Sequence, residues 1–171
     1  EKGIEPHQVS DFSTMTFSPF LGTFYTSLKN GDMAANPDTV EAYVPMGTND
    51  MVFWDTDGTE YQWKVINDVS TWGENSGYYC YIGGDKPLSI IENPQITDGS
   101  SCLVLKESYG NCFVPFLVDH YETVYVIDFR YANVNVVDYV KENNIQDLII
   151  MNNITIIASD KVAATIAGLL S

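Results

Sequence analysis

Short apolar runs alternate with amphipathic stretches in the second half of the chain. Three runs have the length of buried strands: residues 102–106, 123–128 and 147–151. Apolar positions at helical spacing predict helices after each of them: residues 111–121, 134–143 and 159–170, the last with Ser159 as N-cap. This alternation is typical of βαβ units, which build a parallel sheet with right-handed crossovers.

The middle of the chain has a different pattern. β-branched and aromatic runs predict strands at 40–44, 51–54, 61–66, 78–82 and 88–91, with a hairpin over 51–66 around Asp57-Gly58. The first forty residues are interpreted as irregular and aromatic-rich. We therefore expect an α/β fold: a β-rich antiparallel portion over 38–98 joined to a parallel, three-layer portion over 100–171.

The chain of 171 residues fits one domain, 1–171, and 45% hydrophobic residues suffice for a folded core. It lacks an initiator Met and opens in what is interpreted as a helix end, so we expect an incomplete domain, truncated at its N-terminus. No signal peptide and no apolar run long enough to span a bilayer are present.

Charge and cysteine content exclude several classes of function. The formal net charge is −15, which disfavours binding to nucleic acid or to anionic lipid. Three cysteines without a CxxC pair, and only two histidines, make a structural zinc site improbable. The sequence indicates no metal and no cofactor.

Polar clusters follow the three predicted parallel strands, at residues 106–111, 128–131 and 152–153. Ligands of open parallel sheets bind beyond the carboxyl ends of the strands. Convergence of these clusters is the main functional signal of the raw sequence.

Ser108 lies between a predicted strand and a predicted helix, where helix N–H groups favour a developing oxyanion. It is either a nucleophile or only a helix cap, and its position favours neither. A nucleophilic serine needs a base. His120 lies twelve residues further along the chain, roughly 15–18 Å away at helical rise, which is too far to contact Ser108. His7 lies in a segment whose position relative to Ser108 does not follow from the sequence.

The remaining candidates each have a structural alternative. Arg130, the only arginine, is suited to bind a carboxylate or oxyanion, or else forms an internal ion pair with Asp128 or Glu107. Lys106 either extends its amine to solvent or pairs with an acid such as Glu107.

The uncharged candidates have two interpretations as well. Asn153 is an oxyanion donor or a loop cap, and the glycine pair at 83–84 is a ligand contact or a plain β-turn. The three tryptophans at 54, 63 and 72 form a sugar-stacking surface or pack in the core.

Two blocks together carry a resemblance to a known family. Leu103-Val104-Leu105-Lys106-Glu107-Ser108-Tyr109-Gly110-Asn111 is followed by Val126-Ile127-Asp128-Phe129-Arg130-Tyr131. With the upstream block 83–88, they closely resemble the bacterial DHHW protein family, which is similar to the SGNH-hydrolase-like domains of alginate O-acetyltransferases. Glu107 stands where the family more often has Asp.

The resemblance implies that Ser108 is the nucleophile, with an Asp-His pair supplied by an upstream DHHW motif that this sequence lacks. It also implies oxyanion contacts from Gly84 and Asn153. The residues expected to organise the site are Lys106, Glu107, Asn111, Asp128, Arg130 and Tyr131.

The expected function is serine-dependent acyl chemistry, by an esterase or O-acetyltransferase, on a glycan of the cell envelope or outside the cell. The partners are then the glycan and an acyl donor, and the chain alone is expected to be inactive. The alternative is a non-catalytic surface module that binds a polysaccharide or a protein partner. Substrate, direction of acyl transfer and oligomeric state do not follow from the sequence.

Overall fold

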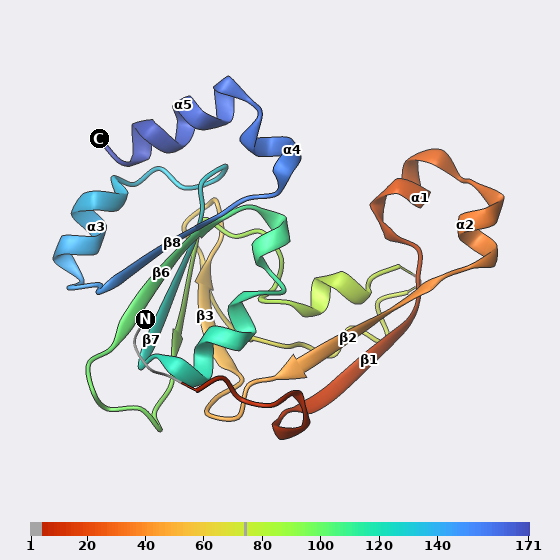
Figure 1. Ribbon diagram of the computed structural model, residues 1–171, viewed down its shortest axis with the longest axis horizontal. Coiled ribbons are helices and arrows are strands. Elements are labelled where there is room, and N and C mark those ends of the chain that lie inside the picture. The colour runs from red at the N-terminus through yellow and green to blue at the C-terminus, as the bar shows by residue number, and fades with distance from the viewer. Residues whose placement is uncertain (1–4, 74) are drawn as a thin grey trace.

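A six-stranded mixed sheet forms the centre of the computed structural model, which describes residues 5–73 and 75–171 (Figure 1). Its strands, in spatial order, are β4 (Glu60–Lys64), β3 (Asp50–Trp54), β5 (Leu88–Glu92), β7 (Thr123–Asp128), β6 (Ser101–Lys106) and β8 (Asp147–Met151). Strands β7, β6 and β8 run parallel, and β4, β3 and β5 join them by antiparallel pairing. The expected α/β fold is confirmed, with β5 linking the antiparallel and parallel portions into one sheet.

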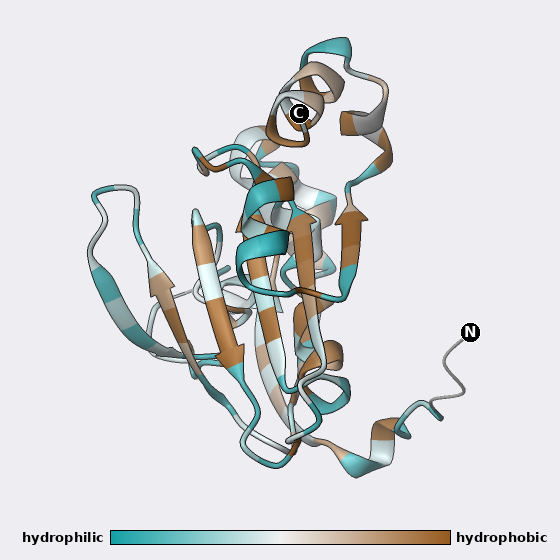
Figure 2. Cartoon of the chain, turned by 90° about the vertical axis from the view of Figure 1, so that its left-hand side faces the viewer, coloured by the Kyte–Doolittle hydropathy of each residue, from teal (hydrophilic) through white to brown (hydrophobic). Residues whose placement is uncertain are grey.

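Helices and turns cover both faces of the parallel strands. The helices are α3 (Val136–Glu142), α4 (Ile154–Ile157) and α5 (Asp160–Leu169), and the 3-10 helices η3 (Ser108–Gly110) and η4 (Val114–His120). Leu103 and Leu105 of β6 share a core cluster with residues of α3 and α5. Cys102 and Val104, which point to the other face, pack with residues of η4. This alternation produces three layers, and hydrophobic residues concentrate on the central strands (Figure 2).

The first forty residues are not irregular, which corrects the expectation. Strand β1 (Ser13–Phe20) pairs antiparallel with β2 (Asp38–Val44) in a separate ribbon. The short helices α1 (Gly22–Leu28) and α2 (Gly31–Ala35) lie at the far end of this ribbon, away from the central sheet (Figure 1). Only Phe17 is buried in β1, so the strand depends on distant pairing with β2 rather than on a local apolar pattern.

Two further predicted elements differ from the structure. The predicted strand 78–82 is instead the 3-10 helix η2 (Gly77–Cys80), and Ile82 and Gly83 then adopt φ values of 46° and 68°, which end any extended backbone. The predicted helix 111–121 is replaced by η3 and η4. A helix from Asn111 would need an N–H at Pro115, which proline lacks.

The predicted hairpin over 51–66 is confirmed as β3–β4, in which Trp54 pairs with Glu60. In residues 5–73 and 75–171, no helix combines the length and the apolar character needed to cross a bilayer.

Candidate functional site

The carboxyl ends of β6, β7 and β8 meet at one edge of the sheet. Lys106, the last residue of β6, pairs in register with Asp128 of β7 and Met151 of β8. Just beyond these ends, Glu107 Oε1 accepts the backbone N–H of Asn153 at 3.0 Å. The three polar clusters expected to converge are therefore brought together.

Ser108 lies at the centre of this edge, half-buried, in the tight turn after β6. Its hydroxyl donates to Glu107 Oε2 at 3.2 Å, and its carbonyl oxygen accepts the Tyr78 hydroxyl at 2.7 Å. The turn η3 contains only three residues. The expected contribution of a helix dipole to an oxyanion is therefore wrong here, because so few peptide units sum to a negligible dipole.

Glu107, rather than Ser108, caps this turn. Its side chain is 1% exposed, and Oε2 also accepts the N–H of Tyr109 at 3.3 Å. The alternative in which Ser108 serves only as a helix cap therefore fails. Glu107 holds the serine hydroxyl, the turn and the end of β8 with two carboxylate oxygens.

A compact ion cluster lies beneath the turn. Lys106 Nζ is 3.2 Å from Asp128 Oδ2 and 3.3 Å from Asp85 Oδ1. Arg130 donates from Nε and Nη2 to the two oxygens of Asp128 at 2.9 and 2.6 Å. The internal ion pair with Asp128 is thus present, whereas neither Lys106 nor Arg130 pairs with Glu107 among the described contacts.

The acidic partners hold Arg130 in its charged form. Hydrogen bonding to Asp128 raises the pKa of the guanidinium, and this outweighs the opposing effect of burial. Asp128 occupies the Nε–Nη2 edge of the guanidinium, and Nη2 also lies 2.8 Å from Asp85. Tyr131 is 48% exposed, and its ring centre lies 5.3 Å from the Arg130 guanidinium.

Asp85 belongs to this cluster but was not predicted from the sequence. It accepts a hydrogen bond from Asn111 Nδ2 at 3.0 Å and lies 2.8 Å from Arg130 Nη2. Its position directly after Gly83-Gly84, in the block 83–88 that resembles the DHHW family, was the available signal. Across the described residues, no three histidine, cysteine or acidic side chains are grouped as a metal site.

Gly110 and Asn111 fix the turn against β6. A methyl group at Gly110 would lie 2.6 Å from Lys106 Cβ, so only glycine allows this approach. The Asn111 side chain is 2% exposed; its Nδ2 binds Asp85, and its Oδ1 lacks a hydrogen-bond partner within the described part of the chain. Asn111 thus joins the turn to the ion cluster.

The two residues expected to contact an oxyanion have structural roles as well. The N–H of Gly84 donates to the carbonyl of Tyr81 at 2.9 Å, in a turn with φ of 83° at Gly84. Asn153 Oδ1 accepts the N–H of Ile156 at 3.2 Å, in the first turn of α4. The turn and cap alternatives therefore describe these contacts, and oxyanion binding by either residue stays a prediction.

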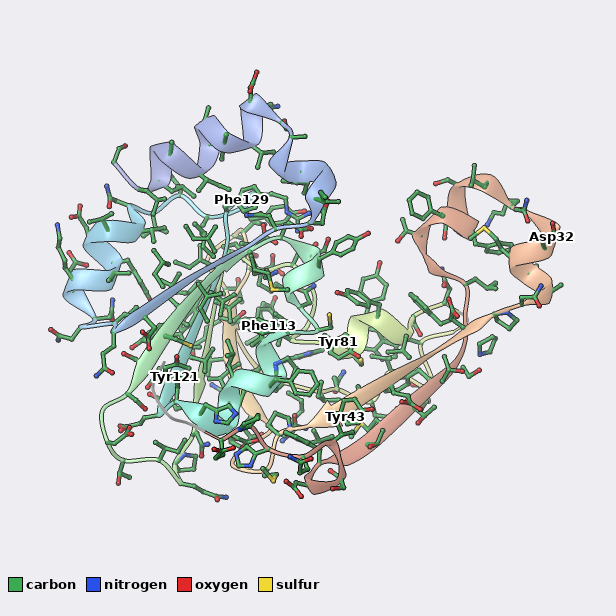
Figure 3. The ribbon with its side chains drawn as sticks, in the orientation of Figure 1. Asp32, Tyr43, Tyr81, Phe113, Tyr121 and Phe129 are labelled. Carbon is green, nitrogen blue, oxygen red and sulfur yellow. The ribbon has the colours of Figure 1, made fainter. Side chains whose placement is uncertain are left out.

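Both histidines lie at the opposite edge of the sheet from Ser108. His120 precedes β7, whereas the site follows it, and six residues of strand separate the two ends by roughly 17 Å. Figure 3 labels Tyr121 and Phe129, which flank β7 and mark these ends. The ring of His7 stacks on His120 with centres 4.9 Å apart. Neither imidazole can take a proton from the Ser108 hydroxyl in this arrangement.

Known proteins share this fold. A DHHW family protein from Eubacterium siraeum DSM 15702 is 26% identical with a TM-score of 0.83, covering 97% of this chain and 55% of that one. PatB1 of Bacillus cereus, solved with and without a sulfonyl adduct, is 22% and 24% identical with TM-scores of 0.73. Those alignments cover 95% of this chain and 53% and 55% of PatB1.

The chain thus spans about half the length of these solved structures. No curated protein matches it. The family model described as "DHHW protein" matches residues 2–127, which include β1 to β6, the Ser108 turn and β7 up to Ile127. The chain belongs to the DHHW protein family.

Proposed function

We propose that Ser108 is the nucleophile in an acyl transfer or ester hydrolysis reaction. The observation that carries the proposal is the place of its hydroxyl, half-buried where the ends of β6, β7 and β8 meet. Open parallel sheets bind ligands at this edge. The sulfonyl adduct named for PatB1 supports a reactive nucleophile on this fold, since such adducts form by nucleophilic attack on sulfur.

The reaction follows the usual course of serine acyl chemistry. Ser108 Oγ attacks the ester carbonyl while its proton passes to a base, and collapse of the tetrahedral intermediate expels the alcohol and leaves an acyl-serine. Water or an acceptor hydroxyl then attacks the acyl group and regenerates the serine. Gly84 and Asn153 are proposed to donate to the oxyanion, for which the Gly84 N–H has to leave the Tyr81 carbonyl that it binds at 2.9 Å. Lys106, Asn111, Asp128, Arg130 and Tyr131 are proposed to hold their segments in place.

The base is proposed to come from residues outside 1–171, because both histidines of this chain lie at the far edge of the sheet. The resting hydrogen bond from Ser108 to Glu107 does not replace it. The Glu107 oxygens already accept two backbone N–H groups, from Tyr109 at 3.3 Å and from Asn153 at 3.0 Å, so this carboxylate is engaged in holding the turn and the end of β8. The chain alone is therefore proposed to be inactive.

A glycan ester of the cell envelope or extracellular space is the proposed substrate, which follows the resemblance to O-acetyltransferase domains. The test compares hydrolysis of 4-nitrophenyl acetate and of an acetylated polysaccharide by this chain and by a version that includes the preceding encoded residues. Only the longer version should turn over, and Ser108→Ala should reduce its rate by at least about a thousandfold. Equal turnover by the short chain contradicts the proposal.

A second candidate is a binding module, which the aromatic surface around β4 favours. Trp63 lines a hollow of about 320 Å³ together with Asp50, Gln62, Lys64 and Asn67. The ring centre of Trp72 lies 6.3 Å from that of Trp63. Trp72 is 52% exposed, so its ring is accessible for stacking on a sugar ring. Trp72→Ala should then abolish polysaccharide binding by this chain, whereas Ser108→Ala should leave it unchanged.

A further inference from the structure

Asp85 connects three separate segments at the candidate site. Its Oδ1 lies 3.3 Å from the amine of Lys106 and accepts a hydrogen bond from Asn111 Nδ2 at 3.0 Å. Its Oδ2 lies 2.8 Å from Arg130 Nη2. Lys106 ends β6, Arg130 follows β7 and Asn111 follows η3. One carboxylate therefore touches the segments on both sides of Ser108 and the loop after the neighbouring strand.

The charges of this group balance. Asp85 and Asp128 supply two carboxylates, and Lys106 and Arg130 supply two cations; the Lys106 and Asp128 side chains are 1% and 0% exposed. Burial alone would raise the pKa of the Asp85 carboxyl. Lys106, the hydrogen bond from Asn111, and Arg130 outweigh burial and lower this pKa, so Asp85 is ionised at neutral pH.

The turn before Asp85 is held from its other side too. Lys86 Nζ lies 2.7 Å from Asp55 Oδ2 and 4.5 Å from the centre of the Phe53 ring. These two contacts attach the loop to the β3–β4 hairpin. Directly before these two anchored residues, Ile82, Gly83 and Gly84 adopt positive φ values of 46°, 68° and 83°.

Such a backbone needs external support. A non-glycine residue in the left-handed region, here Ile82, costs about 1–3 kcal/mol and persists only where neighbouring contacts fix it. The side chain of Asp85 supplies such contacts toward the site, and that of Lys86 supplies them toward the hairpin. The contacts of two adjacent residues therefore fix the turn: those of Asp85 to the candidate site and those of Lys86 to the hairpin.

We propose that Asp85 is a positioning residue that couples the turn at residues 82–84 to the Ser108 segment. Through Lys106 and Asn111 it fixes the separation between the Gly84 backbone and the Ser108 hydroxyl. The structural coupling stands by itself, whereas its effect on rate rests on the proposed function of Ser108.

Hydrogen exchange of the 171-residue chain tests the coupling. Asp85→Asn removes the charge that holds Lys106 and Arg130, so peptides spanning 82–85 and 107–111 should both exchange about tenfold faster or more. Peptides of α3 and α5 should not change. Asp55→Asn is the matched control, because it releases Lys86 on the other side of the turn; it should accelerate 82–86 and leave 107–111 unchanged.

Acceleration of 82–85 alone in Asp85→Asn, or an equal rise throughout the chain, overturns the coupling. Two further variants guard against simple misfolding. Asp85→Glu keeps the charge and should recover part of the protection in both peptides. Arg130→Gln removes one partner of Asp85 and leaves the Lys106 pair, so the same two peptides should respond with smaller amplitude.

The effect on rate is measured in the version proposed to be active, which includes the preceding encoded residues. Asp85→Asn should lower kcat about tenfold with little change in KM, because the substrate still binds while the oxyanion contact is misplaced. A change confined to KM overturns the positioning role. If wild-type protein shows no serine-dependent turnover, the proposed function fails, and the exchange pattern still decides the coupling.

Discussion

The Ser108 hydroxyl donates to the carboxylate of Glu107, 3.2 Å away and one residue earlier in the chain. The same carboxylate accepts N–H groups from Tyr109 and Asn153 at 3.3 and 3.0 Å. A single buried side chain therefore determines where the serine oxygen points and joins the turn to the end of β8. Three stability predictions test this account of the site, a fourth concerns the histidine pair at the opposite end of β7, and covalent labelling tests the role of Ser108.

Glu107→Gln removes the negative charge and turns one acceptor oxygen into a donor. Hydrogen bonds to a charged acceptor contribute about 1.5–3 kcal/mol each, so we expect the free energy of unfolding to fall by about 2 kcal/mol. Urea denaturation measures this change. The exposed Glu60→Gln on β4 is the control, expected to stay within about 0.5 kcal/mol of wild type; equal effects of both variants would show that Glu107 is not a structural link.

Lys106→Met leaves Asp128 without one of its two cationic partners. Breaking a buried ion pair costs about 3–5 kcal/mol, and the lower end applies because Arg130 still binds Asp128. The matched control is Lys64→Met, which removes the exposed pair with Asp50 and should cost at most about 1 kcal/mol. A variant at Lys106 as stable as wild type would mean that the amine is not needed to balance the cluster.

Gly110→Ala places a methyl group 2.6 Å from Lys106 Cβ. The turn has to move away from β6, and overpacking of this kind costs about 1–3 kcal/mol. Gly168→Ala in α5 is the control, since its added methyl group meets no atom within 4 Å and alanine favours a helix. We expect thermal unfolding to show a lower Tm for the first variant and an unchanged or higher Tm for the second.

Acidification is expected to loosen the contact between His7 and His120. Burial lowers the pKa of His120, His7 lowers it further, and Asp119 opposes them. Because the folded state favours the neutral ring, this stabilisation is present above the ordinary histidine pKa of about 6.5 and is lost as the pH falls through the lower folded value. Wild type should therefore lose more stability than His120→Phe between about pH 7.5 and 5.5; parallel curves would contradict this.

The parallel half of the fold could be predicted well from the sequence, and the reason is physical. The run from Cys102 to Lys106 is buried on both faces, so its apolar character is continuous and its carboxyl end is marked by the first polar residues. The same logic located Ser108 at a strand end. It could not reveal β1, in which only Phe17 is buried and pairing with a distant strand supplies the order.

The aromatic run at 78–82 shows the opposite error. Tyr78 and Cys80 have side chains suited to a strand, but they lie in a 3-10 helix, from which Tyr78 reaches the carbonyl of Ser108. The strand propensity of a residue reflects how well its side chain packs on a half-buried surface, and it does not require the backbone to be extended. Asp85 was missed because its importance comes from three partners distant in sequence, and a single aspartate in a turn has no pattern of its own.

Covalent labelling by a fluorophosphonate probe tests the central claim most directly. In the version that includes the preceding residues, the serine oxygen should displace fluoride from phosphorus, and peptide mass spectrometry should find the adduct on Ser108. Ser108→Ala should abolish the adduct, and the exposed Ser70→Ala should not. An adduct on a different serine, or an unmodified Ser108 after prolonged exposure of folded protein, would contradict its assignment as the nucleophile.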